Sequence, residues 1–461
     1  MAKLTPGDSG FWAFGRVLSG TVARNQRVHC VGPAFDPALG AHQADVFENV
    51  SVQSLALPRG AEFAPVDSVA AGSLVLLGGI DKFLNRTGTV VAAAQPLASV
   101  HPVRGMKYTV SAVVAVAVRP KRAADQAAYS KALQKLAKTD NLVQITFDAA
   151  AGETVIAGAG ELHLEIVLAE LRSLAKVELM VGDPVVALRE TVVGSCASSL
   201  AKSSNKHNRV FMGCEPVAEP LRLALEQERV PADAKERAAL LVEHPEMGLD
   251  GRNPKKLWAL GGEAGGNVLQ DATHGVDYLH EVQSVFLASL HRLAAAGPLC
   301  GEPVHGVSWS VRDVKLHAER VHRSDLPEAV RRSLSGALLQ AEPRLLEPVL
   351  LCTVEAPRAL AGALYTFLAS RQARVAREEQ HEGAPLVTLT AHLPALQSLG
   401  FDAALRKVSS GAAFCSLAFS HYQLIDSDPL QEGSLAHRLV AEKRKRKGMP
   451  PLDPSLFIDK L

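Results

Sequence analysis

Two strings of basic and polar residues are the parts of this chain best equipped for chemistry. The first runs from Lys202 to Arg209 and reads Lys-Ser-Ser-Asn-Lys-His-Asn-Arg, and the second runs from Asp313 to Arg323. Lys, Arg and His side chains contact phosphates, and Ser and Asn hydrogen-bond the 2′-hydroxyl groups of RNA. Composition alone favours a solvated polar loop for both strings. Contact with RNA is therefore a hypothesis that needs independent support.

The usual signatures of catalysis are missing from the sequence. No string matches the phosphate-binding pattern G-x-x-x-x-G-K-[ST], and the Gly-rich run 261–266 lacks the lysine, which favours a plain flexible loop. Glu161, His163 and Glu165 alternate, but they begin an expected helix, where residues two apart do not share a face. A helix-start role is favoured for them over a metal site. We expect no catalytic residues and no bound metal.

Composition limits the class of protein. The chain has 461 residues, 47% of them hydrophobic and 21% charged, with a formal net charge of +1, which is typical of globular domains. The six cysteines are scattered without a C-x-x-C pair, so neither a disulfide framework nor a zinc site is indicated. No apolar run approaches the roughly 18 residues of a membrane span, and the N-terminus lacks a signal-peptide core. We expect a cytoplasmic protein with no membrane partner.

The elements that position the two strings form a multidomain α+β chain. Residues 1–103 show short strands with Gly and Pro turns, which predicts a small β-barrel. Residues 104–183 and 343–430 both follow the order β-α-β-β-α-β, which is the split β-α-β or ferredoxin-like pattern. An elongated α+β domain is expected between them over 184–342. A helix and a tail close the chain over 431–461.

Several elements are expected with definite bounds from hydrophobic periodicity and turn residues. They are strands at Arg27–Val31 and Val50–Leu55, and helices at Glu161–Ala175, Ala356–Leu368 and Leu435–Lys445. The basic run Lys443–Lys447 in the last helix is interpreted as a solvated face.

Ordered matches along the chain carry a family resemblance. Ser204-Asn-Lys-His-Asn-Arg209 and Leu316-His-Ala-Glu-Arg-Val-His322 are similar to two loops of the fourth domain of eukaryotic and archaeal translation elongation factor 2. Further segments resemble that family in the same order: Phe11–Gly20, Asp81–Thr89, Ile156–Ile166, Glu342–Pro348, Ala441–Gly448 and Phe457–Leu461.

The resemblance implies a ribosome-binding factor that promotes translocation of tRNA and mRNA. The barrel would be the family's domain II, the two ferredoxin-like domains its domains III and V, and residues 184–342 its domain IV, an arm that enters the ribosomal decoding site. The histidine at the position modified to diphthamide would be His322. The tip that contacts ribosome and tRNA would comprise Ser204, Asn205, Lys206, His207, Asn208, Arg209, His317, Arg320 and Arg323. Its partners would be rRNA, tRNA and mRNA.

The sequence departs from the family at two places. No counterpart of the GTP-binding domain precedes the barrel, so GTP and magnesium are expected only if such a domain is supplied in cis or in trans, and completeness of the first barrel strand is open. After His322 the family has a Gly-rich run, whereas Ser324–Glu328 contains Pro327. Asp325 and Glu328 have the spacing of a capping box, which predicts a direct helix start. Modification of His322 is therefore left open.

Three interpretations follow from these departures. The chain is the C-terminal part of an elongation factor 2, or a short paralogue that binds ribosomes or RNA without GTPase activity, or a ribosome maturation factor of the same superfamily.

Overall fold

The computed structural model divides into two compact units. One comprises residues 1–147 and 153–185, and the other comprises residues 148–152 and 186–461. The structure describes residues 12–33, 35, 37, 45–60, 62–84, 87–103, 112–140, 142–148, 153–226, 229–231, 234–249, 253–260, 266–276, 278–317, 325–380 and 383–459.

The first unit begins with short antiparallel strands, and those that the structure describes do not close into the predicted barrel. Within the described residues they make a four-stranded sheet in the order β1-β8-β5-β6, a pair β2-β7 and a three-stranded sheet β4-β3-β9. Their apolar faces share one core. The sequence pattern predicts where strands occur, but it does not predict which strands hydrogen-bond to each other. Closure of the sheet into a barrel could therefore not be derived from it. The bounds are β1 (Trp12–Arg16), β2 (Thr21–Ala23), β3 (Arg27–Val31), β4 (Val46–Ser51), β5 (Ser54–Arg59), β6 (Glu62–Pro65), β7 (Ser68–Ala70), β8 (Leu74–Gly78) and β9 (Thr89–Ala92).

The predicted strand at Arg27–Val31 is confirmed by β3, but the single strand predicted at Val50–Leu55 is wrong. The chain there crosses from the sheet of β3 to the sheet of β8. The amide of Val52 donates to Gln26 O, and the next amide, of Gln53, donates to Gly78 O. Because consecutive residues pair with different sheets, one apolar run is divided between β4 and β5.

The first unit ends in a ferredoxin-like fold. Its sheet has the order β11-β12-β10-β13, with the two helices α1 and α2 packed together. Helix α2 spans Glu161–Ala175 as predicted, because Leu164, Val167, Leu168 and Leu171 recur at helical spacing and are buried. The elements are β10 (Val114–Pro120), α1 (Gln126–Thr139), β11 (Gln144–Asp148), β12 (Glu153–Gly158), α2 and β13 (Leu179–Val181), followed by β14 (Val185–Val186).

His163 has a structural role at the start of α2. Its Nδ1 accepts the amide of Ala159 at 3.1 Å, and its Nε2 lies 2.7 Å from Asp140 Oδ2. With Nδ1 accepting, Nε2 carries the proton and donates to the carboxylate. Burial raises the pKa of Asp140, but the hydrogen bond from His163 and those from backbone amides lower it below its ordinary value. The histidine therefore ties the end of α1 to the start of α2.

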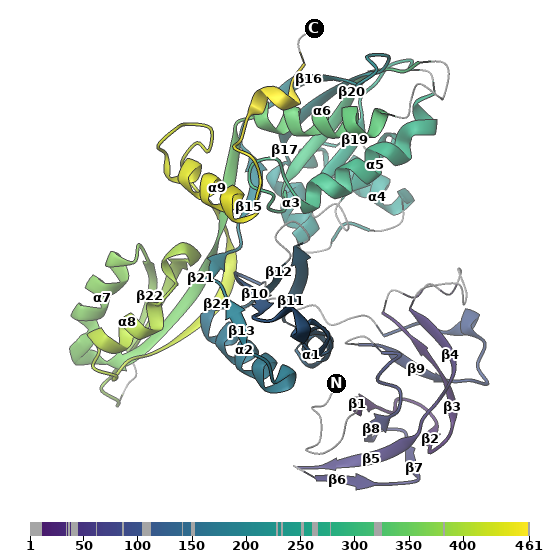
Figure 1. Ribbon diagram of the computed structural model, residues 1–461, viewed down its shortest axis with the longest axis vertical. Coiled ribbons are helices and arrows are strands. Elements are labelled where there is room, and N and C mark those ends of the chain that lie inside the picture. The colour runs from purple at the N-terminus through teal and green to yellow at the C-terminus, as the bar shows by residue number, and fades with distance from the viewer. Residues whose placement is uncertain are drawn as a thin grey trace. The chain divides into compact units, whose positions relative to one another are not determined.

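A mixed five-stranded sheet forms the first part of the second unit. Its order is β16-β17-β20-β19-β18, and only β19 and β20 run parallel. Helices α5 and α6 pack together, and α6 lies on β16 and β17 (Figure 1). The bounds are β16 (Cys196–Lys202), β17 (Arg209–Pro216), α3 (Glu219–Glu226), α4 (Ala234–Glu243), β18 (Leu257–Leu260), β19 (Val268–Asp271), α5 (Leu279–Ala295), β20 (Val307–Lys315) and α6 (Leu326–Gln340).

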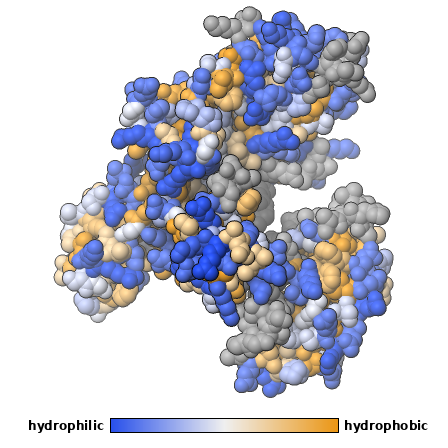
Figure 2. Space-filling model, in the orientation of Figure 1, coloured by the Kyte–Doolittle hydropathy of each residue, from blue (hydrophilic) through white to orange (hydrophobic). Residues whose placement is uncertain are grey.

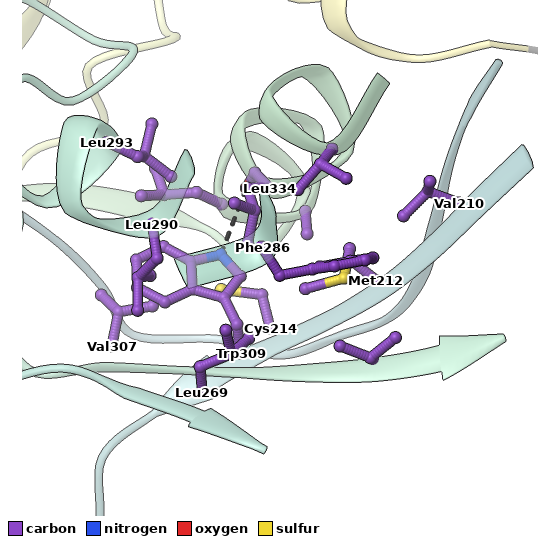
Figure 3. Close-up of a cluster of buried hydrophobic side chains, with 14 of the residues drawn as sticks. Val210, Met212, Cys214, Leu269, Phe286, Leu290, Leu293, Val307, Trp309 and Leu334 are labelled. Atoms are coloured by element: carbon purple, nitrogen blue, oxygen red, sulfur yellow. Dashed lines mark hydrogen bonds between the residues drawn. The ribbon is translucent and has the colours of Figure 1, made fainter. Parts of the chain in front are cut away.

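The core of this sheet-and-helix domain centres on Trp309. The indole is fully buried between Cys214 and Leu290, and its Nε1 donates to Leu334 O at 3.2 Å (Figure 3). Burying a large ring with its one polar group satisfied gives apolar contact without a desolvation penalty. The sheet that carries the first polar string is therefore packed against a well-ordered hydrophobic core.

The second ferredoxin-like fold also matches its predicted element order. Strand β24 pairs with β21, and the sheet continues through β23 to β22. Strand β15 pairs with the first residues of β21 and so adds a fifth strand to this sheet. The bounds are β15 (Arg189–Val192), β21 (Pro343–Pro357), α7 (Ala361–Ser370), β22 (Arg374–Gln380), β23 (Leu386–Pro394), α8 (Phe401–Val408) and β24 (Phe414–Leu424).

The predicted start of the helix at Ala356–Leu368 is wrong by five residues. Strand β21 extends to Pro357, whose backbone is extended at φ −57° and ψ 137°, and α7 begins at Ala361. A proline disfavours the helical conformation of the residue before it, which keeps Ala356 in the strand.

Candidate nucleic-acid interface

The first polar string forms the turn between β16 and β17, and we call residues 203–209 the hairpin tip. The amide of Ser203 donates to Asn208 O at 3.0 Å, and the amide of Lys206 donates to Ser203 O at 2.7 Å. Asn205 Oδ1 accepts from Ser203 Oγ at 2.5 Å and from the amide of His207 at 3.0 Å. Lys206 has a left-handed φ of 59°. The Ser and Asn side chains thus close a defined turn from within.

Asn208 joins the two polar strings. Its side chain is fully buried, its Oδ1 accepts the amide of His317 at 3.1 Å, and its Nδ2 donates to Ser203 Oγ at 3.4 Å. The rings of His207 and His317 meet edge to face with centroids 5.1 Å apart. The structure therefore brings the first string together with His317, the last described residue of the second string. Asn208 is itself buried and holds the tip, and its predicted contact with RNA stays a prediction.

The exposed side chains of the hairpin tip are cationic or polar. Ser204, Lys206, His207 and Arg209 are exposed, and Asn205 is partly exposed. Contact of these residues with RNA stays a prediction. Arg320, His322 and Arg323 lie outside the described residues, as does most of the loop that contains them.

A basic row, Lys202, Arg209 and Lys315, crosses three strands at the base of the tip. Arg209 is paired with Lys202 on one side and with Lys315 on the other. Directly opposed residues of neighbouring strands share a face, with strands about 4.8 Å apart. Arg209 and Lys315 are exposed. This spacing presents a line of positive charge suited to a phosphate backbone.

The C-terminal tail clamps the base of the hairpin. Asp459 Oδ2 accepts the amide of Lys202 at 2.7 Å, and Asp459 Oδ1 lies 2.9 Å from Arg332 Nη2. Burial raises the pKa of Asp459, but these two partners lower it below its ordinary value. A Cβ on Gly336 of α6 would lie 2.7 Å from Phe457 O, so only glycine lets the tail approach this closely. Sequence reasoning missed the clamp because its partners lie more than 100 residues apart.

The predicted start of α6 is confirmed, but the predicted capping box between Asp325 and Glu328 does not form. The helix begins at Leu326, directly after Asp325, and Asp325 makes no side-chain cap. Glu328 instead pairs with Arg331 at 2.9 Å, one helical turn along. The backbone of Asp325 has φ −90° and ψ 5° rather than the extended conformation of a capping residue, and Glu328 is held by Arg331, so the hydrogen bonds of the box do not form.

The basic run of the last helix, α9 (Leu435–Arg446), is only partly the solvated face that was predicted. Lys445 and Arg446 are exposed, and hydrophilic residues dominate the surface around α9 in Figure 2. Lys443 and Arg444 are 8% and 6% exposed and belong to the core of the unit. The prediction is corrected for these two residues.

The buried cations and their neighbours form a cluster that we call the charged anchor. It consists of Glu190, Glu302, Lys443, Arg444 and Lys447. Lys443 Nζ and Lys447 Nζ lie 2.9 and 3.0 Å from Glu302 Oε1. Arg444 Nη1 donates to the carbonyl groups of residues 298 and 299 at 3.0 and 2.7 Å. Glu190 accepts three backbone amides of residues 299–302, and burial raises its pKa. Each of these five charged side chains thus has a hydrogen-bond partner, and the loop 297–302 is fixed between α9 and β15.

His305 is a titratable group beside this loop. Burial, and then the nearby Arg189 and Arg222, lower the pKa of His305 to about 4. The imidazole is therefore neutral at neutral pH and does not add to the positive charge of the unit.

Comparison with protein families identifies three segments of the chain. Residues 110–183 match elongation factor G domain III, residues 226–342 match elongation factor G domain IV, and residues 344–433 match the elongation factor G C-terminus. Together they cover more than half of the chain. No helix within the described residues is long and apolar enough to cross a membrane.

Proposed function

Because the chain carries the C-terminal domains of an elongation factor G/elongation factor 2-like translational GTPase, we propose that it holds the tRNA–mRNA complex during translocation. These domains are those of the ribosome-binding part of a translation elongation factor. The hairpin tip with its basic row would be the RNA-contacting surface. The observation that supports this most is that exposed cations gather on a hairpin whose sheet is shared with the strands of the segment that matches domain IV.

The hairpin tip is ordered before it meets a ligand. The turn is closed by its own hydrogen bonds, Asn208 ties it to the second string, and Asp459 clamps its base. The backbone of the turn therefore loses little conformational entropy when the exposed cations meet phosphates, so a larger part of the contact energy appears as affinity. The factor would act with cytoplasmic ribosomes, as the resemblance to elongation factor 2 implies.

Energy for translocation would come from GTP bound with magnesium in a GTP-binding domain, supplied in cis or in trans. None of the described residues is assigned to that reaction. His322 is the proposed diphthamide position, and mass spectrometry of the native protein would detect the modification.

Ribosome co-sedimentation tests the contact surface. The double variant Lys206→Ala, Arg209→Ala is compared with Lys407→Ala, Lys445→Ala, which removes two exposed charges elsewhere in the same unit. We expect about tenfold weaker binding for the tip variant, and a salt dependence reduced by roughly one to two charges. Equal affinity and equal salt dependence of the two variants would rule out phosphate contact by the tip.

A second candidate is a short paralogue or a ribosome maturation factor. The start of α6 directly after Asp325, where the resembled family has glycines, favours it. Affinity purification separates the candidates. A translocation factor is recovered with mature ribosomes and a GTP-binding domain, whereas a maturation factor is recovered with assembly intermediates.

A further inference from the structure

A second candidate site lies at the sheet edge opposite β16. An open pocket of about 890 Å³ is lined by the start of β18, the residues after β19 and the first turn of α5. Strand β18 is the last strand of the sheet on that side. The pocket and the hairpin tip therefore lie on different strands of the sheet, with β20 between them in the strand order.

The lining of this pocket is basic. Lys255, Lys256, His274 and His280 line it, and Asp271 is its acidic lining residue within the described part of the chain. Asp271 Oδ1 already accepts the amide and the hydroxyl of Thr273, at 2.8 and 2.7 Å. The carboxylate is thus held in its own turn, and the described lining residues carry more basic than acidic side chains.

The two lysines are available to an anion. Lys255 is exposed, and the Nζ of the partly buried Lys256 makes a long 3.4 Å hydrogen bond to Thr273 O. Within the described residues neither lysine lies within 4.0 Å of a carboxylate oxygen. This differs from the charged anchor, where each lysine has an acidic partner. A phosphate is a suitable counter-charge for such a pair.

An aromatic ring completes the pocket. Trp258 lies in its wall and is partly exposed. Behind it, Phe286 meets the indole edge to face at 5.5 Å and is itself fully buried in the core. The indole is therefore held in place while part of it faces the pocket. Bases of single-stranded RNA stack on aromatic rings fixed in this way.

We propose that this pocket binds a phosphate-bearing nucleotide, as part of a single-stranded RNA segment, with its base on Trp258 and its phosphate at Lys255 and Lys256. The first turn of α5 adds the positive end of a helix dipole to the same side. The inference deepens the proposed function by giving domain IV a second RNA contact. It is tested without ribosomes, so its failure is distinct from failure of the hairpin tip.

Tryptophan fluorescence of the full chain provides the test. A ten-nucleotide single-stranded RNA is titrated at about 50 mM salt, and the signal of Trp258 is taken as the difference between the wild type and Trp258→Phe. We expect quenching in the wild type that Trp258→Phe abolishes. Lys255→Ala, Lys256→Ala should weaken binding about tenfold, while the control Lys407→Ala, Lys445→Ala should not change it.

Separate titrations with AMP and with inorganic phosphate distinguish the source of the ligand. RNA binding more tightly than AMP supports the proposal, because the phosphate chain adds contacts. AMP binding as tightly as RNA would overturn the RNA assignment in favour of a free nucleotide. Quenching that persists in Trp258→Phe, or an equal effect of the two lysine pairs, would overturn the site. The tip variant Lys206→Ala, Arg209→Ala should leave the Trp258 signal unchanged.

Discussion

Asn208→Ala is the substitution that tests most directly how the hairpin tip is held. The fully buried amide side chain accepts from His317 N at 3.1 Å and donates to Ser203 Oγ at 3.4 Å. Its loss leaves the His317 amide without this acceptor, at a cost of about 1–3 kcal/mol, and the longer bond and the small cavity add about 1 kcal/mol. We expect the free energy of unfolding of the second unit to fall by about 2–4 kcal/mol.

Amide hydrogen exchange and thermal unfolding measure the two parts of this expectation. In Asn208→Ala the His317 amide should exchange faster than in the wild type, and the unfolding temperature should fall by roughly 4–12 °C. Asn205→Ala is the matched control, because its partly exposed side chain accepts hydrogen bonds from Ser203 and His207 within the tip and its loss should cost less than about 1 kcal/mol. Equal exchange of His317 and equal stability in both variants would refute the organising role of Asn208.

Three further substitutions test the supports of the site. Gly336→Ala should displace the C-terminal tail and speed its proteolysis, whereas Gly362→Ala, whose Cβ meets nothing within 4 Å, should raise stability by up to about 1 kcal/mol; equal proteolysis would contradict the clamp. Lys443→Ala should lower the free energy of unfolding, measured with urea, by about 2–4 kcal/mol. The control Lys445→Ala, at an exposed position, should lower it by less than about 0.5 kcal/mol. Similar losses in the two variants would contradict the charged anchor. Because the pKa of His305 is lowered to about 4 in the folded state, a fall in pH protonates this histidine in the unfolded state before it does so in the folded state. Stability should fall by about 1–2 kcal/mol between pH 7 and pH 5, and His305→Gln should remove that loss. An unchanged pH dependence would show that His305 does not carry it.

Local patterns in the sequence predicted the features that depend on neighbouring residues. Helix α2 and strand β3 match their predicted bounds, because periodicity and turn residues determine them within a few positions. The two β-α-β-β-α-β orders follow for the same reason. The meeting of the two polar strings was implied by the family resemblance rather than by composition.

Features that depend on distant partners could not be predicted in this way. Asn208 is polar and lies in a polar turn, so nothing local indicates that it is buried against a residue 109 positions away. Lys443 and Arg444 look like a solvated face until Glu302 and the carbonyl groups of loop 297–302 are placed beside them. Barrel closure failed as a prediction because strand patterns do not specify edge pairing.

Lysine acetylation footprinting of the ribosome-bound protein tests the central claim most directly. Mass spectrometry compares the modification of each lysine in the free and the bound chain. The account predicts protection of Lys206 and Lys315 at the tip, with Lys407 and Lys445 modified equally in both states. Modification of Lys206 and Lys315 that is as fast on the ribosome as in free solution would contradict the claim.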